Sequence, residues 1–143
     1  MTATVRAALV GASAVATNHT TTAGSSSIAQ APAVHFNRFA ALSMLESGDC
    51  DTCVGPNGEM SRYQVAPTVW KQFALSGEEP THEQDARAVS ARILQQRCSA
   101  FAARYGRPPT DFEFYLLWHR PARVHNPTTR EAERAHRFSN LCQ

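Results

Sequence analysis

Apolar residues recur at helical spacing in several stretches of this sequence. The first stretch, residues 36–47, carries an apolar stripe and ends before Gly48, a residue typical of helix C-termini. The second begins at Pro67, because proline is favoured in the first turn of a helix. The longest, residues 83–105, repeats apolar residues mostly every three or four positions and ends at Gly106. These patterns predict three helices.

Three residue pairs have the spacing of a capping box, in which a threonine and an acid or amide three residues later each bond to the other's backbone N–H. They are Thr81 with Gln84, Thr110 with Glu113, and Thr128 with Glu131. Each precedes a stretch of periodic apolar residues. The first pair therefore marks the start of the long helix, and the other two predict two more helices, which makes five.

Residues 48–64 have no helical period and are rich in aspartate, glycine, proline and asparagine. We expect a loop or a short irregular hairpin there. The predicted fold class is mainly α, with about five helices and one irregular segment in a single domain of residues 34–143. A chain of this length can bury one hydrophobic core but not two.

The first 33 residues differ in composition from the rest. A single arginine, Arg6, is followed by the short apolar run AALVGASAVA, which ends in a small-residue pattern typical of signal-peptide cleavage sites. Residues 17–32 are rich in threonine, serine and alanine, which favours a disordered linker. We therefore expect a secretory leader and a secreted or periplasmic protein, with a floppy cytosolic terminus as the alternative. No stretch is apolar enough for stable membrane insertion.

Four cysteines follow this leader, and an even number of cysteines in a secreted chain indicates disulfides. We expect Cys98 and Cys142 to be bonded, because both lie on apolar stripes of helices that must pack in a small domain. A bond between Cys50 and Cys53 is left open. A zinc site is the alternative, but the chain has a single Cys-x-x-Cys pair, so no metal is predicted.

The net charge of +2 is too small to predict binding to nucleic acid. A mildly basic surface would suit an anionic cell-wall polymer, although many ordinary domains have the same balance. The net charge therefore excludes few classes of function. The candidate chemistry comes from particular residues.

Glu46, at the end of the first predicted helix, is the candidate acid. Cleavage of a glycosidic bond needs a carboxylic acid that can deliver a proton to the leaving oxygen near neutral pH, usually with the help of apolar burial. Glu46 follows Leu42, Met44 and Leu45 and precedes a loop that could line a cleft. This placement fits a general acid, but a solvated glutamate at a helix end is the interpretation that the placement alone favours, so the catalytic hypothesis depends on the motif downstream.

A second motif, GEMSRYQVAP, occupies residues 58–67. Together with Glu46 and Ser47, it resembles the active-site frame of the lysozyme-like lytic transglycosylases, which is Glu-Ser, a loop, and then Gly-Ala-x-Gly-Leu-Met-Gln-Val-x-Pro. The glycine, glutamine, valine and proline of this frame are kept. The second glycine is replaced by Ser61, and Leu-Met by Arg62 and Tyr63.

The resemblance implies a lysozyme-like fold around a catalytic cleft. It also implies cleavage of the β-1,4 bond of peptidoglycan between N-acetylmuramic acid and N-acetylglucosamine, with Glu46 as general acid and base. Ser47 and Gln64 would contact substrate or hold the loop beside the acid. Tyr63 would stack on a sugar or pack in the core. No cofactor is implied, and the expected partner is a peptidoglycan strand bound by a monomer.

The third element of the family, Ala-Tyr-Asn-Ala-Gly-Pro and often Arg-Val, is similar to LLWHRPARV at residues 116–124. With a one-residue deletion, Trp118 takes the place of the tyrosine and His119 that of the asparagine, so both are candidate substrate-binding residues. In the family the tyrosine orients the catalytic glutamate by a hydrogen bond. The indole N–H of Trp118 could donate in the same way, and core packing is its other possible role.

Lytic transglycosylases use one glutamate, because the N-acetyl group and the 6-hydroxyl of the substrate complete an intramolecular attack. Glu59, in the loop that would face the acid, is the candidate second carboxylate of a hydrolytic, lysozyme-type reaction. Two alternatives have no catalysis: a cell-wall-binding relative, and a small secreted disulfide-bonded helical protein without a glycan role.

Overall fold

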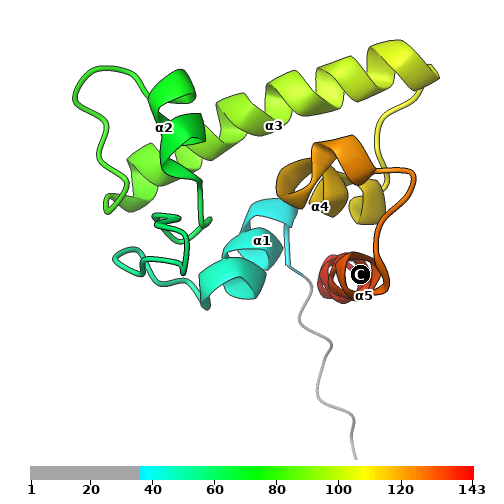
Figure 1. Cartoon of the computed structure of the whole chain (residues 1–143), viewed down its shortest axis with the longest axis horizontal. Coiled ribbons are helices and arrows are strands. Elements are labelled where there is room, and N and C mark those ends of the chain that lie inside the picture. Colours follow the sequence, from blue (N-terminus) through cyan, green and yellow to red (C-terminus); the bar gives the residue numbers. More distant parts are fainter. Residues whose placement is uncertain (1–35) are drawn as a thin grey trace, which may run out of the picture. The chain divides into compact units, whose positions relative to one another are not determined.

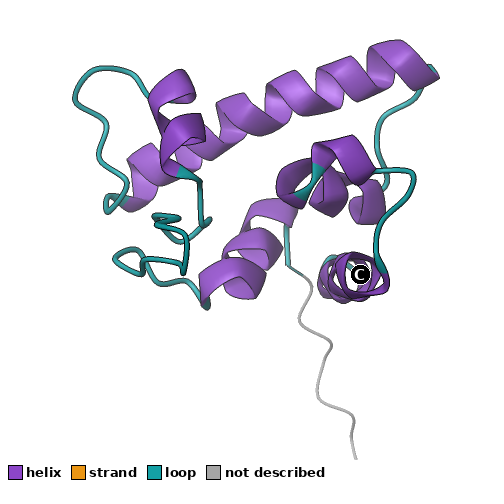
Figure 2. Ribbon diagram, viewed as in Figure 1, coloured by secondary structure: helices purple, strands orange, loops and turns teal. Residues whose placement is uncertain are grey.

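Five α-helices make up most of residues 36–143, the part of the chain that this computed structural model describes. The elements are α1 Arg38–Ser47, α2 Pro67–Phe73, α3 Glu83–Tyr105, α4 Asp111–His119, the short 3₁₀ helix η1 Pro121–Arg123, and α5 Thr129–Leu141 (Figure 1). Figure 2 shows no strand among these residues. The predicted mainly α fold with about five helices is confirmed, whereas the predicted leader lies outside the described residues.

Two of the three predicted capping boxes begin helices. In α4 the Thr110 side chain accepts a hydrogen bond from the Glu113 N–H, and the Glu113 carboxylate accepts one from the Thr110 N–H. Thr128 and Glu131 make the same reciprocal pair in front of α5. Each box satisfies backbone donors that the first turn of a helix leaves without partners, so it fixes where the helix starts.

The capping box predicted at Thr81 is wrong, because α3 begins one residue later. His82 is the N-cap residue and makes no side-chain cap hydrogen bond. Asp85, in the first turn of α3, instead accepts from the Glu79 N–H at 3.1 Å and contacts His82 Nδ1 at 3.3 Å. The loop in front of α3 is therefore held by an acid of the helix rather than by the threonine.

The helix α4 lies between α3 and α5 (Figure 1) and packs against both. Its five consecutive residues Phe114–Trp118 are each 8% exposed or less. The Phe114 ring stacks on Phe138 of α5 with ring centroids 5.7 Å apart, and the Tyr115 ring lies 5.5 Å from the same phenylalanine. Burial on all sides makes α4 the centre of the core and fixes the direction of its side chains.

Candidate active site

Glu46 lies in the last turn of α1, where the helix stops sharply. Gly48 adopts the left-handed conformation with φ 67°, and its N–H donates to the Met44 carbonyl at 3.0 Å. A left-handed residue after the last turn is the usual way to end a helix, and glycine adopts it without steric cost. The chain therefore leaves α1 directly after Ser47, and the side chain of Glu46 stays at the end of the helix.

The carboxyl group of Glu46 is held from two other helices. The hydroxyl of Tyr115, on α4, donates to Glu46 Oε1 at 2.8 Å. Arg134 Nη2, on α5, donates to the same oxygen at 3.2 Å. The Glu46 side chain is only 9% exposed. Within residues 36–143 no hydrogen bond reaches its other oxygen, Oε2, so one oxygen is anchored and the other is available to a ligand.

Tyr115 is suited to hold this carboxyl group. Its side chain is fully buried, and burial, followed by the nearby Glu46 carboxylate, raises the pKa of its hydroxyl. The phenol therefore keeps its proton across the physiological pH range and always donates. The guanidinium of Arg134 lies 5.9 Å from the centre of the Tyr115 ring, so the three side chains form one cluster.

Glu46 lines two adjoining cavities of about 520 Å³ and about 220 Å³. Five residues line both cavities, and they come from α1, from the loop after α1, and from the end of α4: Glu46, Glu59, Gln64, His119 and Arg120. The larger cavity continues over the first turn of α5, and the smaller one continues along Val65 and Trp118. The predicted acid therefore borders a cavity beside Gln64, as the sequence motif requires.

The loop after α1 ends in a short hairpin. Met60 and Val65 pair as an isolated antiparallel bridge, with N–H to carbonyl distances of 2.9 Å and 2.8 Å. Ser61 and Gln64, inside the turn, have positive φ angles of 69° and 52°. The family frame has glycine at the position of Ser61, and left-handed backbone favours glycine there. The prediction of a short irregular hairpin is confirmed, and Ser61 adopts the conformation that the glycine would serve.

The side-chain amide of Gln64 holds the loop. Its Nε2 donates to the Ser61 carbonyl at 3.0 Å and to the Cys53 carbonyl at 3.2 Å. A Cβ atom added to Gly55 would lie 2.5 Å from Gln64 Oε1 and 2.5 Å from Glu59 Oε2. The absence of a side chain at Gly55 therefore lets the glutamine and the glutamate lie close together at the cavity wall.

Glu59 is held by its neighbour Asn57. The Asn57 backbone N–H donates to one carboxylate oxygen and its side-chain amide to the other, both at 2.9 Å. These hydrogen bonds lower the pKa of Glu59, with the side-chain bond as the larger cause. Glu59 is therefore a negative charge at neutral pH, in the same two cavities as Glu46.

His119, at the end of α4, lines both cavities and stacks on the Tyr115 ring with centroids 5.7 Å apart. Burial lowers its pKa, against the opposing effect of Glu46. The imidazole is therefore neutral at neutral pH and can both donate and accept a hydrogen bond. This places His119 where a ligand in either cavity would meet it.

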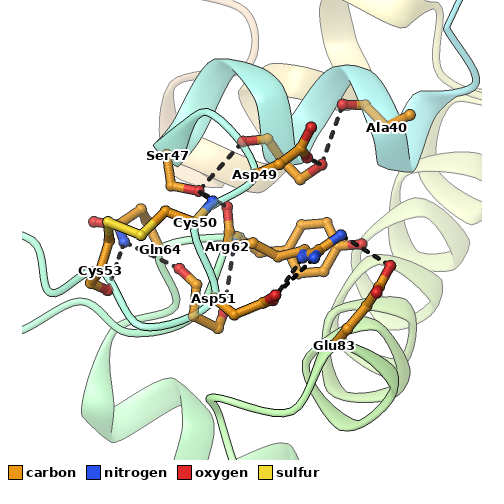
Figure 3. Close-up of polar contacts among 12 residues, drawn as sticks. Ala40, Ser47, Asp49, Cys50, Asp51, Cys53, Arg62, Gln64 and Glu83 are labelled. Atoms are coloured by element: carbon orange, nitrogen blue, oxygen red, sulfur yellow. Dashed lines mark hydrogen bonds and ion pairs between the residues drawn. A yellow bond between two sulfur atoms is a disulfide. The ribbon is translucent and has the colours of Figure 1, made fainter.

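Ser47 and Arg62 build the support behind the site (Figure 3). Ser47 Oγ donates to the Arg62 carbonyl at 2.8 Å and accepts from the Cys50 N–H at 3.0 Å. Arg62 makes a bidentate pair with Asp51 at 2.6 Å and 2.7 Å and a further bond to Glu83 at 2.9 Å. Ser47 lines neither cavity, so its hydroxyl ties the end of α1 to the hairpin instead of meeting a ligand.

The structure distinguishes between the two roles that the sequence left open for Tyr63 and for Trp118. Tyr63 is only 2% exposed, with edge-on contacts to Phe39 and Trp118 at 5.9 Å and 6.4 Å, so its ring packs in the core and offers no face to a sugar. Trp118 does line the smaller cavity, but it does not orient Glu46. That hydrogen bond comes from Tyr115, one helical turn earlier on α4.

The cysteine pairing is the reverse of the main prediction. Cys50 and Cys53 form a disulfide, so they are not zinc ligands. Cys98 and Cys142 are free thiols, and the predicted bond between them is wrong. The helix α4 lies between α3 and α5 (Figure 1) and packs against both, so these two helices do not pack on each other as the prediction assumed.

We expect the replacement of Cys50 and Cys53 together by serine to lower the free energy of unfolding by about 2 kcal/mol, the chain-entropy contribution of so short a loop. Denaturant unfolding of the parent and the double variant measures this. A reducing agent should lower the unfolding midpoint of the parent and leave that of the double variant unchanged. Equal midpoints for the two proteins without reductant would contradict the assigned disulfide.

Comparisons with protein-family models, curated proteins and solved structures give no match to this chain. Among residues 36–143, no helix combines the length and the apolar character that crossing a membrane requires. In the same part of the chain, no three histidine, cysteine, aspartate or glutamate side chains gather as a set of metal ligands. The Glu46 site is therefore the feature of this chain that indicates a function.

Proposed function

We propose that this protein cleaves the β-1,4 glycosidic bond of peptidoglycan between N-acetylmuramic acid and N-acetylglucosamine, by a lytic transglycosylase mechanism with Glu46 as general acid and base. The observation that carries the proposal is the placement of Glu46. Its side chain is 9% exposed and lines both cavities, with Oε1 anchored by Tyr115 and Arg134 and Oε2 without a hydrogen bond in residues 36–143.

In the first step, a proton on Glu46 Oε2 passes to the oxygen of the glycosidic bond. The bond between this oxygen and the anomeric carbon breaks, and positive charge develops at that carbon. Glu46 is left as a carboxylate. The hydrogen bonds from Tyr115 and Arg134 to Oε1 stabilise this ionised form, and the guanidinium supplies the compensating charge.

In the second step, the 6-hydroxyl of the muramic acid attacks the same anomeric carbon. Its proton passes to Glu46, which returns to its starting state, and a 1,6-anhydro ring closes. The N-acetyl group of the sugar stabilises the charge between the steps, so the reaction needs one protein carboxyl group. One anchored carboxyl oxygen and one available oxygen suit both proton transfers.

Two neighbours of Glu46, His119 and Gln64, take no part in the proton transfer. His119 is neutral and lines both cavities, so it can hydrogen-bond to hydroxyl or N-acetyl groups on either side of the bond that breaks. Gln64 uses its amide nitrogen to hold the loop. Its role is therefore to position the cavity wall.

A hydrolytic, lysozyme-type reaction is the second candidate, and one observation favours it. Glu59 is an ionised carboxylate that lines the same two cavities as Glu46. A second carboxylate can activate a water molecule or stabilise the positive charge at the anomeric carbon. The two reactions differ in their products, since hydrolysis leaves a reducing end and transglycosylation an anhydro end.

Replacement of Glu59 by glutamine distinguishes the two reactions. If the attack is intramolecular, we expect the cleavage rate to fall by less than about tenfold, the cost of altered hydrogen bonds at the cavity wall. Mass spectrometry of the products should then find 1,6-anhydro ends only. Exposed Glu79, which lines neither cavity, is the matched control for the same substitution.

The opposite result has two parts. The parent would release fragments with reducing ends, and the cleavage rate of Glu59→Gln would fall by about 10²-fold or more. That outcome would replace the transglycosylase by a muramidase with two carboxylates. A parent protein that binds peptidoglycan without releasing any fragment would instead show a cell-wall-binding relative.

A further inference from the structure

A third cavity, of about 240 Å³, lies against the C-terminal half of α3. It is lined by residues of α3, by Leu117 of α4, and by Pro121 and Val124 that follow α4. None of the residues that the mechanism uses lines it. Its walls combine aromatic, aliphatic and positively charged side chains, so it differs in chemistry from the cavities at Glu46.

The third cavity adjoins the Glu46 site. Arg97 and Pro121 line both this cavity and the 220 Å³ cavity that contains Glu46. The 220 Å³ cavity in turn shares five residues with the 520 Å³ cavity. The three therefore form one series, with Glu46 in the first two and α3 beside the last. A linear polymer cut at Glu46 would reach the third cavity with a distant part of its chain.

The exposed aromatic surface at the third cavity is Tyr105. Its side chain is 38% exposed, although its ring lies 4.6 Å from Phe101 and 4.6 Å from His125. Phe101 itself is 4% exposed and supports the tyrosine from below. An aromatic ring that is fixed by two neighbouring rings and belongs to a residue more than one-third exposed can contact the apolar face of a sugar ring.

The charge of the cavity selects for an anion. Two arginines, Arg97 and Arg104, line it, and no carboxylate does. Arg97 is occupied, because its Nη1 donates to the Leu117 and Trp118 carbonyls at 2.9 Å and 2.7 Å. Arg104 is exposed, and its guanidinium lies 5.5 Å from the centre of the Tyr105 ring. A ligand stacked on Tyr105 would therefore bring a carboxylate within reach of Arg104.

From this juxtaposition we infer that the third cavity is a distal binding site for the same glycan strand, in which Tyr105 stacks on a sugar and Arg104 pairs with a carboxylate that the strand carries. The inference rests on the proposed function and adds a substrate preference to it. Long strands that bear carboxylates should be cut more efficiently than short ones that fill the two cavities at Glu46 alone.

The test compares kcat/KM for long, peptide-bearing glycan strands with kcat/KM for a short oligosaccharide of the same repeat. In Tyr105→Ala the ratio of the two should fall by about five- to tenfold, the usual effect of losing one aromatic stack. Tyr105→Phe keeps the ring and should restore the ratio of the parent. Leu75→Ala, an exposed apolar residue that lines none of the three cavities, is the control.

A second variant separates charge from stacking. Arg104→Gln should lower the ratio on native strands and leave it unchanged on strands whose carboxylates have been converted to amides. Unfolding midpoints of all variants check that the fold is intact. If Tyr105→Ala and Arg104→Gln both keep the ratio of the parent, the distal site is wrong and the Glu46 reaction stands. If the parent cuts neither substrate, the proposed function is wrong and the distal site falls with it.

Discussion

Replacement of Glu46 by glutamine is expected to lower the rate of glycan cleavage by at least about 10²–10⁴-fold, the usual contribution of a general acid. Glutamine has nearly the same shape, so it can still accept hydrogen bonds from Tyr115 and Arg134 at Oε1. It has no proton to deliver and no charge to offset the developing cation. Initial rates on a soluble glycan strand, measured for parent and variant under the same conditions, give the factor.

The matched control is Glu133→Gln, an exposed position on α5 one residue before Arg134 that lines none of the cavities. It makes the same chemical change on the surface and should keep the rate of the parent. Equal unfolding midpoints for Glu46→Gln and the parent would show that the loss is catalytic. A rate for Glu46→Gln within about tenfold of the parent would contradict general acid catalysis by Glu46.

The second large effect is expected for Tyr115→Phe. The change removes only the hydroxyl that donates to Glu46 Oε1 at 2.8 Å. A hydrogen bond to a charged group contributes about 1.5–3 kcal/mol, so kcat should fall by about 10- to 100-fold. The ring keeps its packing on Phe138 and stays in the core. Steady-state kinetics should find the loss in kcat rather than in KM, because Tyr115 lies behind Glu46 and lines none of the cavities.

A matched tyrosine separates loss of the hydroxyl at Glu46 from a general effect on the core. Tyr63→Phe is the control and should keep the kcat of the parent, since it removes the same hydroxyl from a buried tyrosine that lines none of the cavities and does not contact Glu46. A Tyr115→Phe variant with unchanged kcat would show that the hydroxyl has no part in orienting the acid.

The helices could be predicted from sequence signals that involve only neighbouring residues. The capping boxes at Thr110 and Thr128 form as expected, and Gly48 ends α1 in the left-handed conformation that favours glycine. Such signals act within four or five residues, so a sequence displays them directly. The predicted capping box at Thr81, which does not form, is also explained by neighbouring residues. A competing acid, Asp85, lies within the same few residues and holds the loop instead.

Contacts between helices were harder to predict. Tyr115 and Arg134 lie 69 and 88 residues from Glu46 along the chain, and their orientation depends on how α4 and α5 pack. One signal for Tyr115 was present: a phenol inside the apolar run FYLLW must find a hydrogen-bond partner once it is buried. For Arg134 the sequence offers no such signal, because arginines are frequent on the same helix.

The cysteine pairing was also hard to predict, because it depends on how the helices pack. Apolar stripes at Cys98 and Cys142 correctly indicated that both residues face the core, and both pack against it. They could not indicate that α4 lies between the two helices. The bond that does form joins Cys50 and Cys53, three positions apart, where the chain itself keeps the sulfur atoms near each other.

The most direct measurement of the central claim is the release of soluble fragments from purified, insoluble peptidoglycan, followed by mass spectrometry. The parent protein should release muropeptides with 1,6-anhydro-muramic acid ends, and Glu46→Gln should release none above the rate of a buffer blank. No release by the parent, or equal release by parent and Glu46→Gln, would contradict the assignment of Glu46 as the acid of a peptidoglycan-cleaving enzyme.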